Sequence, residues 1–381
     1  MGTHVLKVVI LARSNWERPV RDRNINSKLK MNRKNFLSSL LTLGAVGPAL
    51  AAGKRSSFVP PAAPFPLITP PYLKPGDSIG ITCPAGNITL KEIQPAMQLI
   101  QSWGFQIKIG DTVGKRDAIF GGTDEERAAD FQKMLNDPGI AAILCARGGY
   151  GVVHIIDRLD FVPLIQHPKW IIGFSDITVL LCHIHTNFNM ASVHSKMCNS
   201  FPDDWTKAEP VQAKSILSIR QALAGERMEY TATPHPQNRS GLAEGALIGG
   251  NLKTIETLAG TASDIDTAGK ILFVEDTGEY LYSIDRMFWH LERTGKLGRL
   301  AGLVVGGFKV KPDDPGEEFG RTVVDIVTER VRSYSYPVCF DFPVGHQKEN
   351  YALKYGIPHI LDTRDGQARL SEKSVTIAPL P

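Results

Sequence analysis

The chain has 381 residues and a mass of 41.8 kDa, which exceeds one ordinary domain of about 150 residues and fits two domains, or one domain with a tail. With 43% hydrophobic residues, 22% charged residues and a mean hydropathy of -0.10, the composition is typical of a soluble globular protein and excludes fibrous, disordered and multi-span membrane proteins. Residues 1–51 hold nine of the 43 Lys and Arg but two of the 39 Asp and Glu, so the remainder carries 34 basic and 37 acidic side chains and gives no support for nucleic-acid binding.

The first part of the chain has the pattern of an export signal. A short basic segment over 31–35 precedes an apolar run over 36–51 that ends in Ala-Leu-Ala, a typical cleavage motif. We therefore predict a leader over 1–51 with a signal peptide over 31–51, followed by a proline-rich linker over 52–72. A buried core helix is the weaker alternative, because two glycines and a proline interrupt the run. We expect a periplasmic protein without a stable membrane span after processing, with the cytoplasm as the alternative.

Strand and helix patterns alternate over 73–205, which we predict to be an N-terminal domain. The expected elements are a strand over 78–82, a helix over 92–103, a helix that starts at the capping box Thr123–Glu126, a strand over 140–146 and a strand over 170–172. The last two strands are apolar throughout, as in a parallel sheet that helices cover on both faces. This domain is therefore expected to be α/β with a parallel sheet.

A second α/β unit is predicted over 241–381, after a connection over 206–240 that begins with a helical pattern and continues as a polar, proline-containing segment. Its expected strands lie over 245–251, 271–274, 303–305, 338–340 and 374–377, and its expected helices over 281–291 and 323–331. The short strands and interspersed helices predict a smaller C-terminal α/β domain.

The segment Gly173–Ile177 places Ser175 on a turn between the strand over 170–172 and a helical run. A serine there is exposed at the sheet edge near the positive end of a helix dipole, where a nucleophile belongs. The segment is not the G-x-S-x-G motif of α/β-hydrolases, because Ile177 replaces the last glycine. The alternative is that Ser175 or Asp176 only caps the helix.

A glycine-rich segment, Arg147–Gly151, also lies between a strand and a helix-like stretch. Glycines at such a turn let backbone N–H groups approach a ligand, either as an anion cradle or as part of an oxyanion hole. A nucleotide-binding loop is the alternative, but the segment lacks the G-x-G-x-x-G spacing and the chain has no G-K-[ST] motif.

A nucleophilic serine needs a base, and the base needs a group that orients it. Glu275 follows the apolar strand over 271–274, and His346 lies in a loop after the strand over 338–340, so both qualify. Each alone could equally be a surface carboxylate or a loop histidine. His194 is a further candidate for the pocket wall. Five cysteines without a C-x-x-C pair and the absence of an H-E-x-x-H motif predict no metal and no disulfide framework.

Taken together, these pieces resemble the LD-carboxypeptidase family of serine peptidases, also called muramoyltetrapeptide carboxypeptidases, along nearly the whole mature chain. The segments, in order, are Lys74–Gly80 with Pro84–Gly86, Phe120–Gly122, Arg147–Gly151, Gly173–Thr178, Gly249–Leu252, Phe273–Asp276, Ile284–Arg286 and Gly345–His346. The resemblance implies a flavodoxin-like N-terminal α/β domain with a parallel sheet, a smaller C-terminal α/β domain and a homodimer without metal or other cofactor.

By position, the resemblance implies that Ser175 is the nucleophile, that His346 is its general base and later general acid, and that Glu275 orients the imidazole. The three side chains come from two domains, so domain packing itself would create the active site. This triad is the central expectation for the structure.

The resemblance also implies an oxyanion hole from the backbone N–H of Asp176 and that of Gly148 or Gly149. Arg147 is a candidate for binding a substrate carboxylate, and a salt bridge within the protein is its alternative.

The implied substrates are L,D-peptide bonds, in particular the bond to the terminal D-alanine of murein tetrapeptides, so a muropeptide is the expected partner. A microcin-immunity-type peptidase of the same family and a non-catalytic muropeptide-binding protein are the alternatives. Well-known family members act in the cytoplasm, whereas this leader predicts export. The segment Val193–Met197 also departs from the His-Gly-Pro-like turn expected in the family, which bears on pocket shape and substrate choice.

Overall fold

The computed structural model describes residues 66–373, which all belong to one compact unit. The predicted leader over 1–51, with its signal peptide over 31–51, and the strand expected over 374–377 lie outside the described residues. Within residues 66–373, no helix is both long and apolar enough to cross a membrane. All five cysteines lie within the described residues, where they are free and buried.

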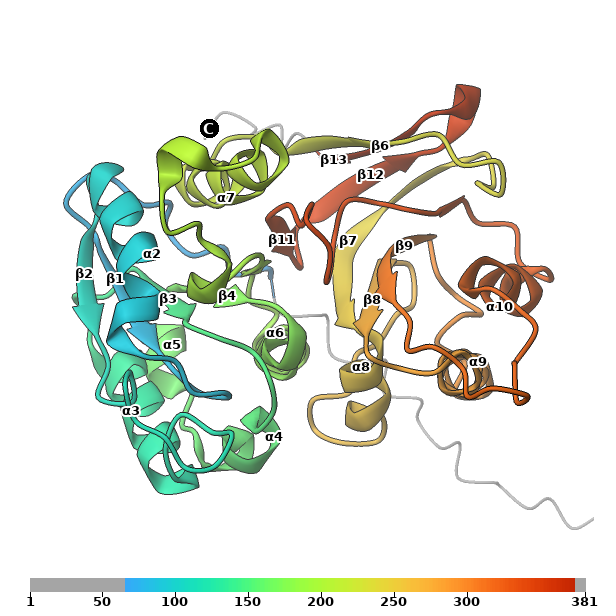
Figure 1. Cartoon of the computed structure of the whole chain (residues 1–381). Coiled ribbons are helices and arrows are strands. Elements are labelled where there is room, and N and C mark those ends of the chain that lie inside the picture. The colour runs from blue at the N-terminus through green and yellow to red at the C-terminus, as the bar shows by residue number, and fades with distance from the viewer. Residues whose placement is uncertain (1–65, 374–381) are drawn as a thin grey trace, which may run out of the picture. The chain divides into compact units, whose positions relative to one another are not determined.

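A six-stranded sheet forms the core of the N-terminal lobe, drawn mostly in blue and green in Figure 1. Its spatial order is β2 (Gln106–Ile109), β1 (Ser78–Thr82), β3 (Ala142–Cys145), β4 (Trp170–Gly173), β5 (Ser192–His194) and β11 (Leu353–Tyr355). Strands β1 to β5 pair in parallel, in the order 2-1-3-4-5 of flavodoxin-like folds. The predicted parallel-sheet domain is confirmed.

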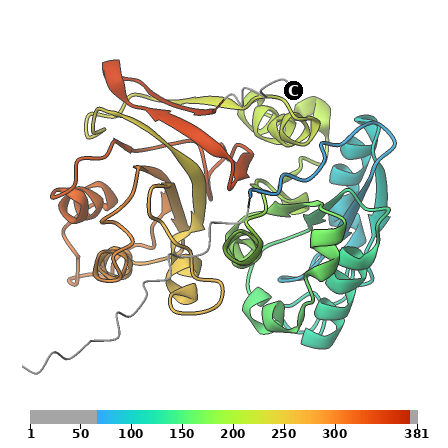
Figure 2. The same ribbon diagram turned by 180° about the vertical axis from the view of Figure 1, so that it is seen from behind.

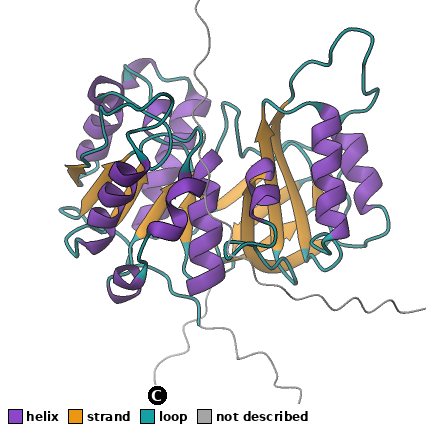
Figure 3. Cartoon of the chain, turned by 90° about the horizontal axis from the view of Figure 1, so that it is seen from below, coloured by secondary structure: helices purple, strands orange, loops and turns teal. Residues whose placement is uncertain are grey.

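Helices cover both faces of this sheet, as Figure 3 shows for the lobe on its left. They are α2 (Leu90–Ser102), α3 (Asp124–Asn136), α4 (Val152–Ile155), α5 (Val162–Gln166), α6 (Thr178–Phe188) and α7 (Pro210–Ala224). Neighbouring strand residues pack on opposite faces: Leu144 belongs to the core with Ile93 of α2 and Ile216 of α7, whereas Ile143 belongs to the core with Phe131 of α3. The absence of polar alternation in the sequence follows from this double covering.

A seven-stranded mixed sheet forms the C-terminal lobe, drawn in yellow to red in Figure 1. Its order is β10 (Val338–Cys339), β9 (Gly302–Lys309), β8 (Ile271–Thr277), β7 (Leu242–Asn251), β12 (Pro358–Asp362), β13 (Ala368–Glu372) and β6 (Glu229–Ala232). The first four strands are parallel and the last three antiparallel. Helices α8 (Leu252–Leu258), α9 (Leu281–Arg293) and α10 (Val323–Val331) accompany the parallel part. The predicted second α/β lobe is confirmed.

The two lobes are interleaved: segments from the later part of the chain belong to the N-terminal lobe, and one stretch contributes elements to both lobes. The segment over 206–240, expected as a connection, contains α7, which packs on the first sheet, and β6, which belongs to the second. Strand β11 lies late in the chain but pairs antiparallel with β5, with Leu353 opposite His194 (Figures 1 and 2). The backbone N–H of Asn251, at the end of β7, donates to Thr178 Oγ1 at the start of α6 at 3.1 Å. These contacts bring the carboxyl ends of β4 and β8 together at the boundary between the two lobes.

Candidate active site

Ser175 lies on a sharp turn at the carboxyl end of β4. The strand ends at Gly173, and Ser175 starts a 3₁₀ turn that leads directly into α6. Its φ of 63° is in the left-handed region, which a serine rarely adopts and which costs about 1 kcal/mol or more. Strain of this kind is typical of a nucleophile that a tight strand-to-helix turn lifts out of the sheet.

The structure brings the three predicted catalytic side chains together. Ser175 Oγ lies 3.2 Å from His346 Nε2, and His346 Nδ1 lies 2.5 Å from Glu275 Oε2. Because the buried carboxylate accepts the proton on Nδ1, the lone pair of Nε2 is free to accept the hydroxyl proton of Ser175. Glu275 is fully buried, whereas the imidazole is 19% exposed, so the reactive end of the row faces the surface.

Two local irregularities place the carboxylate and the imidazole. The pairing of β8 with β9 shifts register between Val274 and Asp276, and such a bulge re-aims the intervening Glu275. Gly345 has a φ of 109°, and a Cβ built on it would lie 2.5 Å from Glu275 Cβ. Only glycine therefore allows the loop before His346 to lie directly against the glutamate.

Behind the triad, His194 and Asn350 hold the same loop. Asn350 Oδ1 accepts the N–H of Gly345 at 2.8 Å and lies 3.2 Å from His194 Nε2. The His194 side chain is fully buried beside the rings of Phe174 and Phe273, and burial lowers its pKa to about 4. The expectation that His194 lines the pocket is wrong; its neutral ring is part of the support for the loop.

Asp176 ties the serine turn to the neighbouring loop. Its Oδ2 accepts the N–H of Val152, the first residue of α4, at 2.8 Å, and burial raises the pKa of the carboxyl to about 6. The Ser175 hydroxyl contacts His346, and α6 has no side-chain cap. The alternative that Ser175 or Asp176 merely caps this helix is therefore wrong.

The glycine-rich turn after β3 lies directly against the serine. A Cβ built on Gly148 would come within 2.9 Å of Ser175 Cβ, so only a glycine allows this approach. This position suits a backbone donor for an oxyanion; the donor roles assigned to Asp176, Gly148 and Gly149 stay predictions. Arg147 is exposed, and its Nη1 donates to the carbonyl of Asn87 at 3.1 Å.

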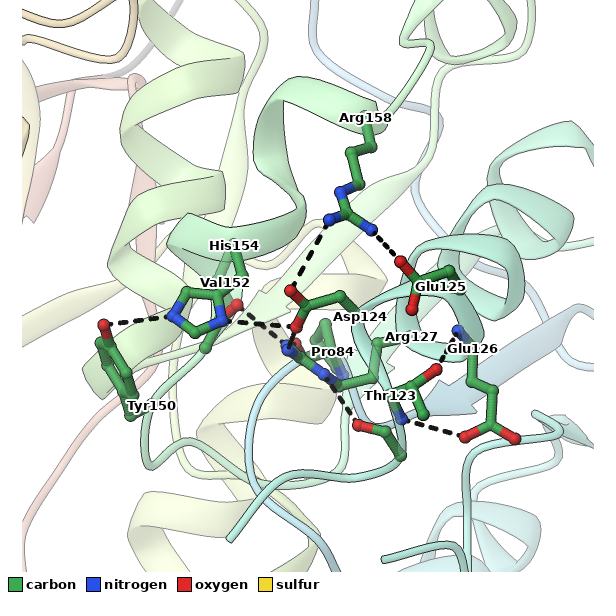
Figure 4. A network of polar contacts seen from close by, with 12 residues as sticks. Pro84, Thr123, Asp124, Glu125, Glu126, Arg127, Tyr150, Val152, His154 and Arg158 are labelled. Atoms are coloured by element: carbon green, nitrogen blue, oxygen red, sulfur yellow. Dashed lines mark hydrogen bonds and ion pairs between the residues drawn. The ribbon is translucent and has the colours of Figure 1, made fainter. Parts of the chain in front are cut away.

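A buried arginine that sequence reasoning missed braces this turn. Arg127 is fully buried, and its Nη1 donates to the carbonyls of Pro84 at 2.6 Å and Gly151 at 2.9 Å (Figure 4). Its Nε donates to the carbonyl of Gly122 at 3.3 Å, and its Nη2 pairs with Asp124. One guanidinium thus joins three loops, and no signal in the sequence separates it from a surface arginine on α3.

A cavity of about 280 Å³ opens beside Ser175. Its wall includes Gly149 from the glycine-rich turn and, from the C-terminal lobe, Asn251, Asp276 and Glu279; Arg147 does not line it. A larger cavity of about 460 Å³ lies at the amino end of β1, at Ser78, and contains none of the predicted site residues. Among residues 66–373, no group of three or more His, Cys, Asp or Glu is arranged to hold a metal ion.

Comparison with known proteins matches both lobes to one family. The model of the LD-carboxypeptidase N-terminal domain matches residues 79–195, and that of the LD-carboxypeptidase C-terminal domain matches residues 244–361. A probable murein peptide carboxypeptidase of Bacillus subtilis is 32% identical over 305 residues, which cover 78% of this chain and 93% of the relative. The murein tetrapeptide carboxypeptidase of Pseudomonas aeruginosa is 29% identical over 289 residues, which cover 74% and 92%.

Among solved structures, a muramoyltetrapeptide carboxypeptidase from Oxalobacter formigenes superposes with a TM-score of 0.69 at 27% identity, covering 78% of this chain and 99% of that one. A microcin self-immunity protein of Escherichia coli is 25% identical over 336 residues, which cover 81% of this chain and 96% of the relative. Fold, matched domains and relatives agree. The chain belongs to the LD-carboxypeptidase family of peptidases.

Proposed function

We propose that this protein is a serine L,D-carboxypeptidase that removes the terminal D-alanine from peptidoglycan-derived tetrapeptides. The observation that carries the proposal is the row formed by Ser175 Oγ, His346 and Glu275, with its contacts of 3.2 and 2.5 Å. The substrate class comes from the relatives, two of which are named as murein peptide and murein tetrapeptide carboxypeptidases.

The reaction follows from the order of the three groups. His346 Nε2 takes the hydroxyl proton as Ser175 Oγ attacks the carbonyl carbon, and Glu275 stabilises the imidazolium that forms. When the C–N bond breaks, the imidazolium gives its proton to the amine of the departing D-alanine, which leaves an acyl-enzyme on Ser175. Water, activated by the same imidazole, then hydrolyses the ester.

The tetrahedral intermediate carries a negative oxygen that needs donors. In this proposal, the N–H of Asp176 and that of Gly148 or Gly149 supply them, and each donor is typically worth about 3 kcal/mol of transition-state stabilisation. The contact of Gly148 with Ser175 and the Arg127 brace both support a rigid position for these donors.

Mass spectrometry of a murein tetrapeptide incubated with the protein tests this function. Loss of one D-alanine by the wild type, and none by Ser175→Ala with retained peptide binding, is the expected result. Equal product release by the two proteins would show that Ser175 is not the nucleophile. Peptide binding without release by either protein would favour a non-catalytic muropeptide-binding protein.

A microcin-immunity-type amidase remains the second candidate, because the self-immunity relative aligns over 336 residues. The murein peptide relatives have higher identities, 32% and 29% against 25%, and for this reason we favour the carboxypeptidase. Incubation with an aminoacyl sulfamoyl adenylate in parallel with the tetrapeptide separates the two: preferential hydrolysis of the adenylate would reverse the assignment.

We also propose that the protein is exported to the periplasm and acts as a homodimer. The sequence pattern over 31–51 supports export, and the family resemblance supports the dimer. N-terminal sequencing of the protein recovered from the periplasmic fraction should begin after residue 51. Light scattering on the purified protein should give about twice the mass of one mature chain.

A further inference from the structure

A second cavity, of about 380 Å³, includes in its wall Lys348, two residues after His346, and its charged lining differs from that of the cavity beside Ser175. The cavity beside Ser175 is lined by three acidic residues, Asp176, Asp276 and Glu279, and by one basic residue, Lys253. The second cavity is lined by Lys196 and Lys348, and also by Glu209, which pairs with Lys348. Acidic residues therefore outnumber basic ones in the wall of the cavity beside Ser175, and basic residues outnumber acidic ones in the wall of the second cavity.

Lys196, in the wall of the second cavity, is linked to the segments that carry His346 and Ser175 by its own contact and by that of the next residue. Lys196 Nζ donates to the carbonyl of Gln347, the residue after His346, at 2.8 Å. Met197, the residue after Lys196, lies against the turn that carries Ser175, since a Cβ on Gly148 would be 3.1 Å from Met197 Cε and 2.9 Å from Ser175 Cβ.

The charge of Lys196 is not compensated within the described residues. Lys348 pairs with Glu209 at 2.8 Å, but no carboxylate among residues 66–373 lies within 4 Å of Lys196 Nζ. An ammonium group has three donors, and the Gln347 carbonyl takes one. The half-buried side chain is also desolvated, which lowers its pKa. A desolvated cation with spare donors is costly unless an anion completes it.

The reaction itself brings an anion, the carboxylate of the leaving amino acid, close to His346. His346 Nε2 must protonate the departing amine, so the leaving residue lies beside the imidazole while the acyl part extends elsewhere. In a carboxypeptidase the leaving residue is a free amino acid, and its carboxylate is two covalent bonds from that amine. Lys196 contacts the backbone carbonyl of Gln347, which directly follows His346 in the chain. The ammonium group therefore lies on the segment that carries the imidazole.

We propose that Lys196 binds the terminal carboxylate of the leaving D-amino acid and so makes the site select substrates with a free C-terminus. The inference rests on the proposed carboxypeptidase function and adds the residue that determines exopeptidase specificity. Arg147, the cation suggested by the sequence, is exposed and donates to Asn87 instead. Lys196 stands in the segment Val193–Met197, which departs from the expected family turn.

The test crosses two substrates with two lysine variants. A murein tetrapeptide with a free C-terminus and the same peptide as its C-terminal amide are given to wild type, Lys196→Met and Lys207→Met. Wild type should prefer the acid by about 10- to 100-fold in kcat/KM, mainly through KM, as expected for one charge-assisted hydrogen bond. Lys196→Met should bring the ratio close to one. Lys207, exposed and paired with Asp204, serves as a charge-matched control that keeps the preference.

Failure of this inference and failure of the proposed function give different results. If wild type cleaves the acid and Lys196→Met keeps the full preference for it, Lys196 does not bind the carboxylate; loss of the preference in Arg147→Met would then assign it to Arg147. If wild type cleaves neither peptide, the carboxypeptidase proposal falls and this inference falls with it. Calorimetry of acid and amide binding to Ser175→Ala, with and without Lys196→Met or Lys196→Gln, measures the same preference without turnover.

Discussion

The two lobes supply the active site by different physical means. In the N-terminal lobe, Gly148 and Ser175 follow two adjacent parallel strands, β3 and β4, so the rule that such strands end at one edge already places them together. In the C-terminal lobe, Glu275 and His346 are 71 residues apart and depend on a bulge, a glycine contact and the return of β11 to the first sheet. The nucleophile is thus positioned by local chain geometry, and its base by tertiary packing.

The largest effect is expected from a change of Glu275, the carboxylate of the C-terminal lobe that contacts the imidazole of His346. Glu275→Gln keeps the shape but removes the charge that fixes the Nδ1 proton and stabilises the imidazolium, so kcat should fall by about 10³- to 10⁴-fold. Steady-state kinetics on the tetrapeptide measure it. Glu244→Gln, on the exposed part of β7 and paired with Lys373, is the matched control and should keep full activity. Retention of a tenth of the activity in a folded Glu275→Gln would remove Glu275 from the mechanism.

Gly345→Ala tests whether packing alone places the base. The new Cβ would meet the Glu275 side chain at 2.5 Å in a backbone conformation that alanine disfavours, so the loop must shift away from the glutamate. We expect kcat to fall by about 100-fold, because a displacement near 1 Å costs that much in a preorganised site. Gly316→Ala is the control: its φ is 82°, and nothing lies within 4 Å of the added Cβ. Equal losses in both variants would attribute the effect to backbone strain instead.

Sequence patterns predicted the parallel half of the fold well because its signals are local. The apolar strand patterns gave β3 and β4, and the capping box at Thr123 does start α3 with both of its hydrogen bonds. Strand β11 was not predicted, because Leu353–Tyr355 has three residues and no usable alternation. Its position depends on pairing with β5, which the sequence of neither strand indicates.

The same distinction applies to the site. The segment Gly173–Ile177 predicts a strand-to-helix turn, so the position of Ser175 follows from its neighbours in the chain. His194 looked equally suited to a pocket wall and is instead buried behind the triad, since only the fold decides which side of a short strand faces the cavity. Arg127 carried no signal at all, because its role consists of contacts with carbonyls from three separate loops.

Arg127→Met tests how much the buried arginine stabilises the loops of the N-terminal lobe. Its loss leaves the buried carbonyls of Pro84 and Gly151 without their donor, and we expect the free energy of unfolding to fall by about 3 kcal/mol. Denaturant unfolding measures it. Arg158→Met removes an exposed arginine that contacts Asp124 in the same network and should cost less than about 1 kcal/mol (Figure 4). Similar losses in the free energy of unfolding for the two variants would mean that the buried position of Arg127 does not stabilise the loops that it contacts.

The smallest effect concerns the carboxyl that joins the serine turn to α4. Burial raises the pKa of Asp176 from 3.8 to about 6, so the folded protein keeps this proton up to about pH 6, while the unfolded chain loses it near pH 4. The wild type therefore loses stability as pH rises from about 4 to 6, and the loss persists above that range. Asp176→Asn can still accept from the N–H of Val152 but cannot ionise. It should be more stable than wild type by about 2 kcal/mol at pH 8, with the difference vanishing at pH 4.

Asp137→Asn provides the control of opposite sign for this pH dependence. Its carboxylate accepts from Lys108 and from the N–H of Gly139, and these bonds lower its pKa. A lowered pKa contributes stability above the unfolded value near 3.8 and loses it as pH falls through the folded value, so this variant should be less stable than wild type at pH 8. Thermal unfolding of the two variants and wild type between pH 4 and 8 compares them directly. A pH-independent difference for Asp176→Asn would show that the carboxyl is solvated, and that the turn carrying Ser175 is more open to water than its packing against α4 indicates.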